Sequence, residues 1–330
     1  WRRRKPAEVE EHFKEKRMSL RIIYGKSGSG KSEYCFNEIA KLVKTEKKIY
    51  IITPEQFSFT AEKKLMDAID TKAVINAEVL TISRMAHRVL QELGGNTKTQ
   101  LTKCGKSMLI YSILNENKNN LKFLSKSDEN IDLSMTAITE FKKHGVLPQD
   151  LQQEIENTDD QYLKTKLNDM FLIYSNFEKK LQGEYIEDTD LLTMLSNTIE
   201  DTDIVKDSLI YIDEFSGFTY QEYEVLKKFI KIAKQVTITV CTDSLEPSLK
   251  PDTDIFYPNK VTISKIMNLV KEEKLKLEKT VYLGETPRFK TEELKYLEKN
   301  IFNNRAKKYD KKVENIKLFL AKNQYSEIEN

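Results

Sequence analysis

The clearest chemical signal in the sequence is an eight-residue loop rich in glycine and serine. Residues 25–32 read GKSGSGKS and match the pattern G-x-x-x-x-G-K-[ST], between an apolar run and a helical pattern. A strand before the motif and a helix after it are the context in which such a loop binds phosphate. Glycines let backbone amides line an anion nest, and the helix N-terminus adds a favourable dipole. The loop therefore predicts a nucleotide-phosphate site made by Gly25, Lys26, Ser27, Gly28, Ser29, Gly30, Lys31 and Ser32.

An acidic pair far along the chain is the second chemical signal. Asp213 and Glu214 directly follow the apolar run 209–212. We expect Lys31 to contact the β- and γ-phosphates of ATP, and the Ser32 hydroxyl and Asp213 to hold Mg²⁺. Glu214 would orient or deprotonate the attacking water. Such a pair is also a common turn or helix cap, but its combination with the phosphate loop favours catalysis.

Short apolar runs that alternate with amphipathic stretches indicate how these residues are positioned. The pattern predicts an α/β fold of the P-loop NTPase type, with a parallel sheet and crossover helices. The predicted strands cover residues 20–24, 48–53, 77–81, 208–213 and 236–241. Between the third and fourth strands, the region around 100–200 has helical periodicity and no convincing strand, so we predict a helical subdomain inserted into the sheet domain.

The predicted organisation follows from these elements. It comprises a polar N-terminal tail at 1–17, the P-loop domain in two parts at 18–99 and 206–250, a helical insertion at 100–205, and the start of a second domain at 251–330. Near the end, the apolar pattern of 313–320 predicts another strand. Ser326 and Glu329 fit a capping box at a helix N-terminus. Because this predicted helix would begin so close to Asn330, we expect the chain to be the N-terminal part of a longer protein.

Composition excludes several other functions. The chain has 330 residues, 39% of them hydrophobic and 32% charged, with a net charge of +2. A strongly basic nucleic-acid footprint is therefore not expected over the whole chain. Three cysteines and three histidines without metal-ligand spacing argue against disulfide scaffolds, zinc sites and histidine-based catalytic triads. Without an apolar run of about 18 residues, no membrane span is expected, and we predict a cytoplasmic protein.

Further segments resemble motifs of superfamily-one helicases, which have RecA-like folds. ITPEQF at 52–57 resembles the DNA-contacting motif Ia, VLTISRM at 79–85 the motif after it, DTDLL at 188–192 the acidic segment before motif II, and IDEF at 212–215 motif II itself. Together with the phosphate loop and TPRFKTEELKYLE at 286–298, they resemble the N-terminal part of the B subunits of bacterial AddAB-type helicase–nucleases. The resemblance runs from about residue 20 to the end, and it implies that 251–330 is the start of a second helicase-like domain.

This resemblance implies a role on DNA. It implies processing of double-strand DNA ends for homologous recombination, recognition of the hotspot Chi, and an A-type helicase–nuclease subunit as partner. A nuclease domain and an iron–sulfur cluster would lie in a C-terminal part outside this chain. The residues that we predict to contact single-stranded DNA or duplex ends are Gln56, Phe57, Thr81, Arg84, Arg88 and Arg288. Burial statistics favour a core position for Phe57 over a DNA contact, and Arg288 could equally form a structural ion pair.

Three departures from the helicase pattern favour a chain that is not itself the motor. No glutamine precedes the phosphate loop, Ser216 replaces the motif II glutamine, and TDSLE at 242–246 lacks the motif III glutamine. The nucleotide cradle is thus present without the residues that couple it to DNA. Two alternatives stay open: a stand-alone P-loop kinase or ATPase, and a non-catalytic module that scans DNA.

Overall fold

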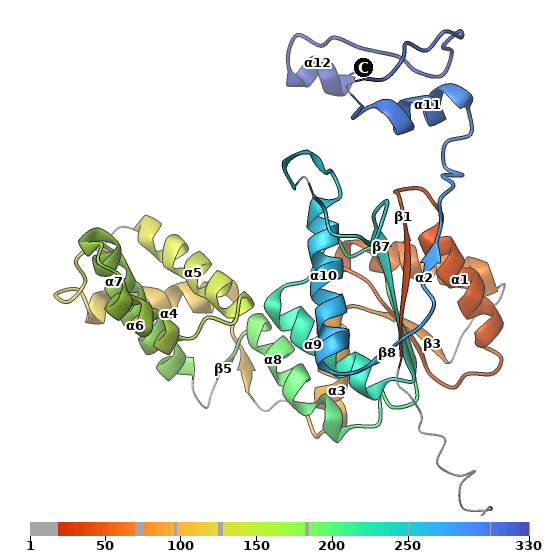
Figure 1. Cartoon of the computed structure of the whole chain (residues 1–330). Helices are drawn as coiled ribbons and strands as arrows, with labels where there is room; N and C mark the ends of the chain where they lie inside the picture. Colours follow the sequence, from red (N-terminus) through yellow and green to blue (C-terminus); the bar gives the residue numbers. More distant parts are fainter. Residues whose placement is uncertain are drawn as a thin grey trace, which may run out of the picture.

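A parallel sheet of seven strands forms the centre of the computed structural model, which describes residues 19–69, 76–95, 98–124, 128–181, 185–249, 251–303 and 305–329 (Figure 1). The strand order is β3-β2-β6-β7-β1-β8, and β9 also pairs with β1. The strands are β1 (Ser19–Gly25), β2 (Ile49–Ile52), β3 (Ala77–Leu80), β6 (Leu209–Ile212), β7 (Gln235–Cys241), β8 (Lys276–Leu277) and β9 (Val281–Tyr282). The predicted tail at 1–17 lies outside the described residues.

The five predicted strands are confirmed as β1, β2, β3, β6 and β7, and so is the α/β fold class. β2 and β6 read IYII and LIYI, and every residue of both is buried. Continuous apolar runs of this kind are typical of parallel strands that are covered on both faces. All these strands run in the same direction, so their carboxyl ends share one edge of the sheet.

Helices cover both faces of the sheet, as such strands require. On one face, α1 (Lys31–Leu42) and α2 (Glu55–Ile69) pack through Phe36, Ile39 and Leu65. The opposite face is covered by α3 (Ile82–Glu92), α8 (Asp188–Thr198), α9 (Tyr220–Ile232) and α10 (Tyr257–Glu272). Two 3₁₀ turns, η2 (Ile199–Asp201) and η3 (Pro251–Thr253), lie in the connections.

A helical arm projects from the sheet domain, to the left in Figure 1. It contains α4 (Lys103–Glu116), α5 (Asp128–Lys143), α6 (Pro148–Asn157) and α7 (Gln161–Leu181), which enclose a core of their own. At its base, β4 (Thr99–Gln100) pairs with β5 (Tyr185–Ile186), a two-residue strand in a region where we predicted none. The predicted insertion at 100–205 thus contributes to two cores, because α8 and η2 pack with the sheet.

A buried ion-pair network joins the arm to α8. The Lys142 amine lies 2.6 Å from Glu187 and 2.9 Å from Asp190, and Lys106 lies 2.7 Å from Glu187. Burial lowers the pKa of Lys142, but the carboxylates of Glu187, Asp190 and Glu178 outweigh it and raise that pKa overall. The DTDLL segment therefore begins α8 and supplies Asp190 to this network, which fixes the direction of the arm.

The C-terminal part differs most from the prediction. α10, β8 and β9 of the expected second domain pack on the first sheet, whereas α11 (Glu292–Asn300) and α12 (Gln324–Glu329) lie beyond the carboxyl edge (Figure 1). The strand predicted at 313–320 is wrong. No described strand pairs with this segment, and Leu318 and Leu320 are 98% and 100% exposed, so its apolar residues have no sheet to pack on.

The predicted capping box at Ser326 is also displaced. The Ser326 amide donates to the Asn323 side chain, and the Ser326 hydroxyl accepts from the Asn323 amide. Asn323 therefore caps α12, three residues before the predicted cap, because its side chain accepts from the Ser326 amide, which has no partner within the helix. Within the described part of the chain, no helix combines the length and apolar character needed to cross a membrane.

Candidate nucleotide-binding site

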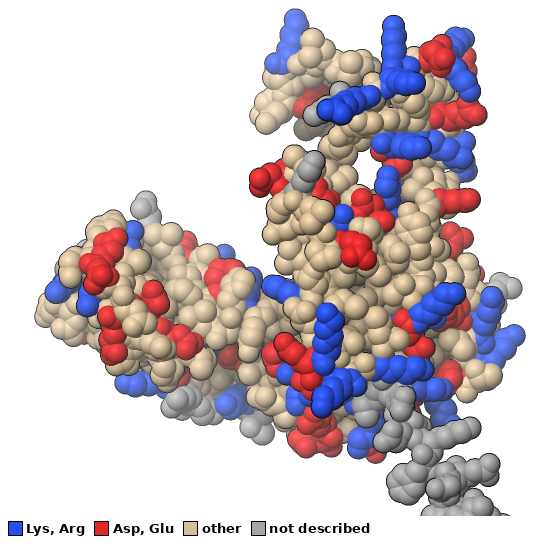
Figure 2. Space-filling model, viewed as in Figure 1, with Lys and Arg blue, Asp and Glu red and all other residues tan. Residues whose placement is uncertain are grey.

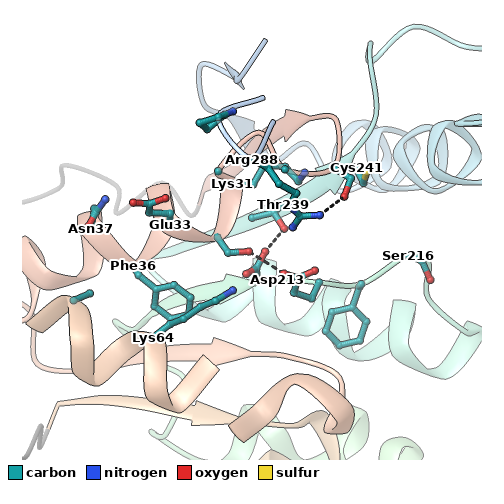
Figure 3. A pocket seen from close by; sticks show the side chains of 18 of the residues that line it. Lys31, Glu33, Phe36, Asn37, Lys64, Asp213, Ser216, Thr239, Cys241 and Arg288 are labelled. Atoms are coloured by element: carbon teal, nitrogen blue, oxygen red, sulfur yellow. Dashed lines mark hydrogen bonds between the residues drawn. The ribbon is translucent and has the colours of Figure 1, made fainter. Parts of the chain in front are cut away.

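The predicted phosphate loop lies at the carboxyl edge of the sheet, between β1 and α1. It borders a cavity of about 750 Å³ that is also lined by residues after β6, by the end of β7 and by residues 287–288 (Figure 3). The structure thus brings together residues that lie far apart in the sequence. Of the predicted site residues, those that line this cavity are Ser27, Gly28, Gly30, Lys31, Ser32, Asp213, Glu214 and Arg288.

Glycine is required in the loop for two different physical reasons. Gly28 and Gly30 have φ of 80° and 84°, a region that other residues adopt only with strain. Gly25 is needed for space, because a Cβ atom there would lie 2.6 Å from the Ser29 hydroxyl and nearer still to the Leu283 carbonyl. The loop therefore closes tightly on itself at the end of β1.

The two lysines of the loop have different roles. The Lys31 amine donates 2.9 Å hydrogen bonds to the carbonyls of Gly25 and Lys26, so it lies inside the curve of the loop. The Lys26 amine instead pairs with Glu298 on α11, at 3.1 Å. Of these two lysines, Lys31 is the one placed to reach a phosphate held by the loop.

The acidic pair occupies the floor of the cavity. Asp213 is 3% exposed, and its carboxylate accepts a hydrogen bond from the Thr239 hydroxyl of β7 (Figure 3). Glu214 has a φ of 65°, an uncommon conformation for a non-glycine residue, and accepts a 3.1 Å bond from the Ser32 hydroxyl. Ser32 and Glu214 are therefore in direct contact, and Asp213 lines the same cavity.

Thr239 was not among the predicted site residues. It belongs to VTITVC, where threonines alternate with aliphatic residues along a strand that is almost completely buried. A buried hydroxyl needs a hydrogen-bond partner. Threonines at alternate positions of an apolar strand therefore indicate a polar contact that could have drawn attention to Thr239. Thr239 holds the Asp213 carboxylate in one orientation.

The residues around the loop fit a nucleotide and Mg²⁺. The Ser29 hydroxyl is buried and has no hydrogen-bond partner among the described residues, which is costly unless a ligand supplies one. The Ser32 hydroxyl and the Asp213 carboxylate are oxygen donors of the kind that Mg²⁺ prefers. Magnesium in such sites keeps several waters and phosphate oxygens, so a cluster of three protein carboxylates is not required.

Arg288 lines this cavity, unlike the other predicted DNA contacts, which lie around α2 and α3. Its guanidinium donates a 3.3 Å hydrogen bond to the Ser27 hydroxyl, and its side chain covers Gly28. The segment after β9 therefore brings a cation against the phosphate loop. Lys64 of α2 also points into the cavity (Figure 3).

The remaining DNA candidates lie around α2 and α3. Gln56 is exposed and Phe57 half-buried in the first turn of α2. Thr81 is buried and caps α3 by accepting from the Arg84 amide. Arg84 pairs with Glu62 of α2, at 3.4 Å.

Arg88, further along α3, pairs with Glu78 of β3 and lies 5.8 Å from the centre of the Tyr50 ring. None of these five residues lines the cavity. Their contact with DNA stays a prediction.

A partly buried network connects α1 with β1 and β6, the elements that flank the loop and the acidic pair. Glu38 of α1 accepts a 2.9 Å hydrogen bond from Arg21 of β1 and a 2.6 Å bond from Tyr211 of β6. Burial raises the pKa of Glu38, but the bonds from Arg21 and Tyr211 outweigh it and lower that pKa overall. Burial, with the nearby Asp213 charge, raises the pKa of Cys35 well above its usual value. Cys35, which is 2% exposed, is therefore a core thiol.

This geometry defines the class of protein. A parallel sheet with helices on both faces, a GKSGSGKS loop after β1, an acidic pair after β6 and an inserted helical arm together define a RecA-like α/β fold of the P-loop type.

Comparison with known proteins identifies the family. The family model described as "ADDB, N-terminal" matches residues 22–298. Relatives named as the B subunit of an ATP-dependent helicase/deoxyribonuclease are 40% identical over 322 residues in Clostridium botulinum (strain Loch Maree / Type A3), 41% over 324 in Clostridium tetani and 37% over 320 in Thermoanaerobacter sp. (strain X514). These alignments cover 94–95% of this chain and 28% of each relative. The chain therefore belongs to the AddB N-terminal family.

Proposed function

We propose that this chain binds ATP with Mg²⁺ at the loop 25–32, as the helicase-like N-terminal part of a helicase–nuclease B subunit. The observation that carries the proposal is the convergence of Lys31, Ser32, Asp213 and Arg288 on one cavity at the carboxyl edge of the sheet. Ligands bind at that edge in open α/β sheets, because loops from neighbouring strands meet there.

Each residue has a defined task in this proposal. The backbone amides of the loop and the Lys31 amine bind the phosphate chain, and Arg288 adds a second cation from the segment after β9. Ser32 and Asp213 hold Mg²⁺, which when bound supplies positive charge to the phosphates. Glu214 exchanges its bond with Ser32 for one with a water molecule and orients that water.

We propose that ATP binding to this chain does not drive movement along DNA. Ser216 borders the cavity at the position where related motors carry a glutamine, and 242–246 has none. A serine hydroxyl is too short to replace a glutamine amide that links the nucleotide to a DNA-binding surface. The proposal therefore combines intact ATP binding with weak coupling between ATP hydrolysis and DNA.

The role of the whole protein is proposed from the relatives. They are named as the B subunit of an ATP-dependent helicase/deoxyribonuclease, so we propose a cytoplasmic subunit that works with an A-type helicase–nuclease partner. Its substrates would be DNA ends processed for homologous recombination, with recognition of Chi. A nuclease domain and an iron–sulfur cluster would belong to parts of the protein outside this chain.

ATP hydrolysis measured with and without DNA tests the proposed weak coupling between hydrolysis and DNA. The purified chain is incubated with ATP and Mg²⁺, alone, with single-stranded DNA and with blunt duplex DNA, and Glu214→Gln is the matched control. We expect slow hydrolysis that DNA raises by less than about two-fold and that Glu214→Gln lowers. Strong DNA stimulation that depends on Glu214 would instead identify a motor.

A further inference from the structure

Two exposed aromatic side chains lie at the outer end of the helical arm, on segments that we call the tip segments, residues 117–124 and 161–168. The rings of Phe123 and Tyr162 pack edge to face, with centroids 5.4 Å apart and planes at 89°. They are 40% and 61% exposed. The Lys166 amine lies 4.6 Å and 4.3 Å from their centroids, which adds a cation–π interaction to the pair.

The tip is fixed in place by a buried carboxylate. Asp169 of α7 is 3% exposed and accepts backbone hydrogen bonds from Lys122, Phe123 and Leu124, the last two at 2.6 and 2.8 Å. Leu121 and Leu124 are buried on either side of this turn. A ligand that binds to the rings therefore meets an ordered surface and pays little conformational entropy to order it.

The charge of the tip segments favours an anionic ligand. Neither segment contains an acidic residue. Of the acidic residues directly next to them, Asp169 has its carboxylate buried beneath the turn, and Glu116 pairs with Lys180 at 2.6 Å. No described residue forms an ion pair with Lys118, Lys122 or Lys164. Asp160, just before α7, is engaged in capping that helix through the amides of Tyr162 and Leu163. On the face of the molecule seen in Figure 2, acidic and basic side chains are interspersed, and acidic side chains also lie on the arm.

Exposed rings beside unpaired cations match one class of ligand. Single-stranded nucleic acid presents bases that stack on aromatic faces and phosphates that pair with basic groups. We propose that the tip of the arm is a stacking site for single-stranded DNA, with Phe123 and Tyr162 receiving bases and Lys122, Lys164 and Lys166 contacting phosphates. The site lies on α7 and the turn before α5, apart from the helicase-like motifs of α2 and α3, and it rests on the proposed role on DNA.

Fluorescence anisotropy with a labelled oligothymidine of about 20 nucleotides tests the proposal. Phe123→Ala/Tyr162→Ala is compared with Met108→Ala/Tyr111→Ala, which removes two exposed side chains from α4 of the same arm. Stacking is worth about 1–3 kcal/mol per base, so we expect the first variant to bind at least about five-fold more weakly. The control should bind like the wild type. An abasic oligonucleotide of equal length and charge should bind both variants and the wild type equally.

The outcomes separate this proposal from the nucleotide site. Unchanged affinity in the first variant, or an equal loss in the control, overturns the stacking site while leaving ATP binding untouched. A wild-type chain that binds no single-stranded DNA overturns both the stacking site and the proposed DNA role. ATP titration of the same samples checks that each variant is folded, because a folded variant should bind ATP at the Lys31 site with wild-type affinity.

Discussion

The hydrogen bond from Thr239 to Asp213 gives the sharpest structural prediction. Thr239→Val keeps the shape of the side chain and removes only the hydroxyl that donates to a carboxylate with 3% exposure. A hydrogen bond to a charged group contributes about 1.5–3 kcal/mol, and a buried carboxylate cannot recover it from water. We therefore expect a loss of about 2 kcal/mol in the free energy of unfolding.

Urea unfolding followed by circular dichroism measures this loss. The matched control is Thr237→Val, which changes a buried threonine two residues earlier on β7 that makes no hydrogen bond to Asp213. We expect the control to lose less than about 1 kcal/mol, the usual net value of a neutral hydrogen bond. The two variants should keep the same m-value, because the same surface is exposed on unfolding.

A functional consequence follows from the same bond. Without Thr239 the Asp213 carboxylate loses its fixed orientation, so Mg²⁺-dependent ATP affinity should fall about ten-fold, while affinity measured in EDTA should stay the same. Equal stability of Thr239→Val and wild type, together with unchanged Mg²⁺ dependence, would refute the assignment of Thr239 as the positioning residue for Asp213.

Three further predictions concern residues around the site and the arm. Glu38→Gln should lower the free energy of unfolding by about 2 kcal/mol at pH 7. Because the native pKa of Glu38 is lowered, this difference from wild type should shrink as the pH falls below about 4.5. A difference in urea unfolding that does not change with pH would contradict the prediction. Lys142→Met should lower the free energy of unfolding by about 3 kcal/mol, and the exposed Lys143→Met by less than about 0.5 kcal/mol. Equal thermal unfolding midpoints for the two variants would contradict a stabilising role of the buried network. Arg288→Ala should weaken ATP binding about ten-fold by fluorescence titration and Arg84→Ala should not. Unchanged ATP affinity in Arg288→Ala would remove Arg288 from the phosphate site.

The sheet was predictable because its signals are local. Apolar runs such as IYII and LIYI, each followed by an amphipathic helix, fix a parallel sheet whatever the rest of the chain does. GKSGSGKS likewise carries its own context, since the strand and helix beside it are visible in the sequence. The acidic pair followed from the same logic at the end of β6.

The misplaced elements depend on partners that the sequence does not display. The pattern of 313–320 is that of a strand, but a strand needs a neighbour, and the free side of β1 already carries β8 and β9. Arg288 is brought to the phosphate loop by these same pairings, so its place could not be derived from its own surroundings in the sequence. The alternation in VTITVC indicates a buried hydroxyl at Thr239, but its partner Asp213 follows only from the pairing of β7 with β6.

The extent of the arm was hard to predict for a related reason. α8 has the same helical periodicity as α4–α7, and periodicity alone does not say which core a helix joins. Its leucines Leu191 and Leu195 pack with the sheet, while Glu187 and Asp190 bind lysines of the arm. One helix thus serves both parts, which a division of the sequence into separate segments cannot express.

The central claim is that ATP binds at the phosphate loop through Lys31. Isothermal titration of ATP with Mg²⁺ into wild type, Lys31→Ala and Lys26→Ala tests it most directly, because the two lysines belong to one loop but only Lys31 points into its curve. We predict saturable binding by wild type and Lys26→Ala, and no measurable binding by Lys31→Ala. Equal ATP affinity in wild type and Lys31→Ala would contradict the account.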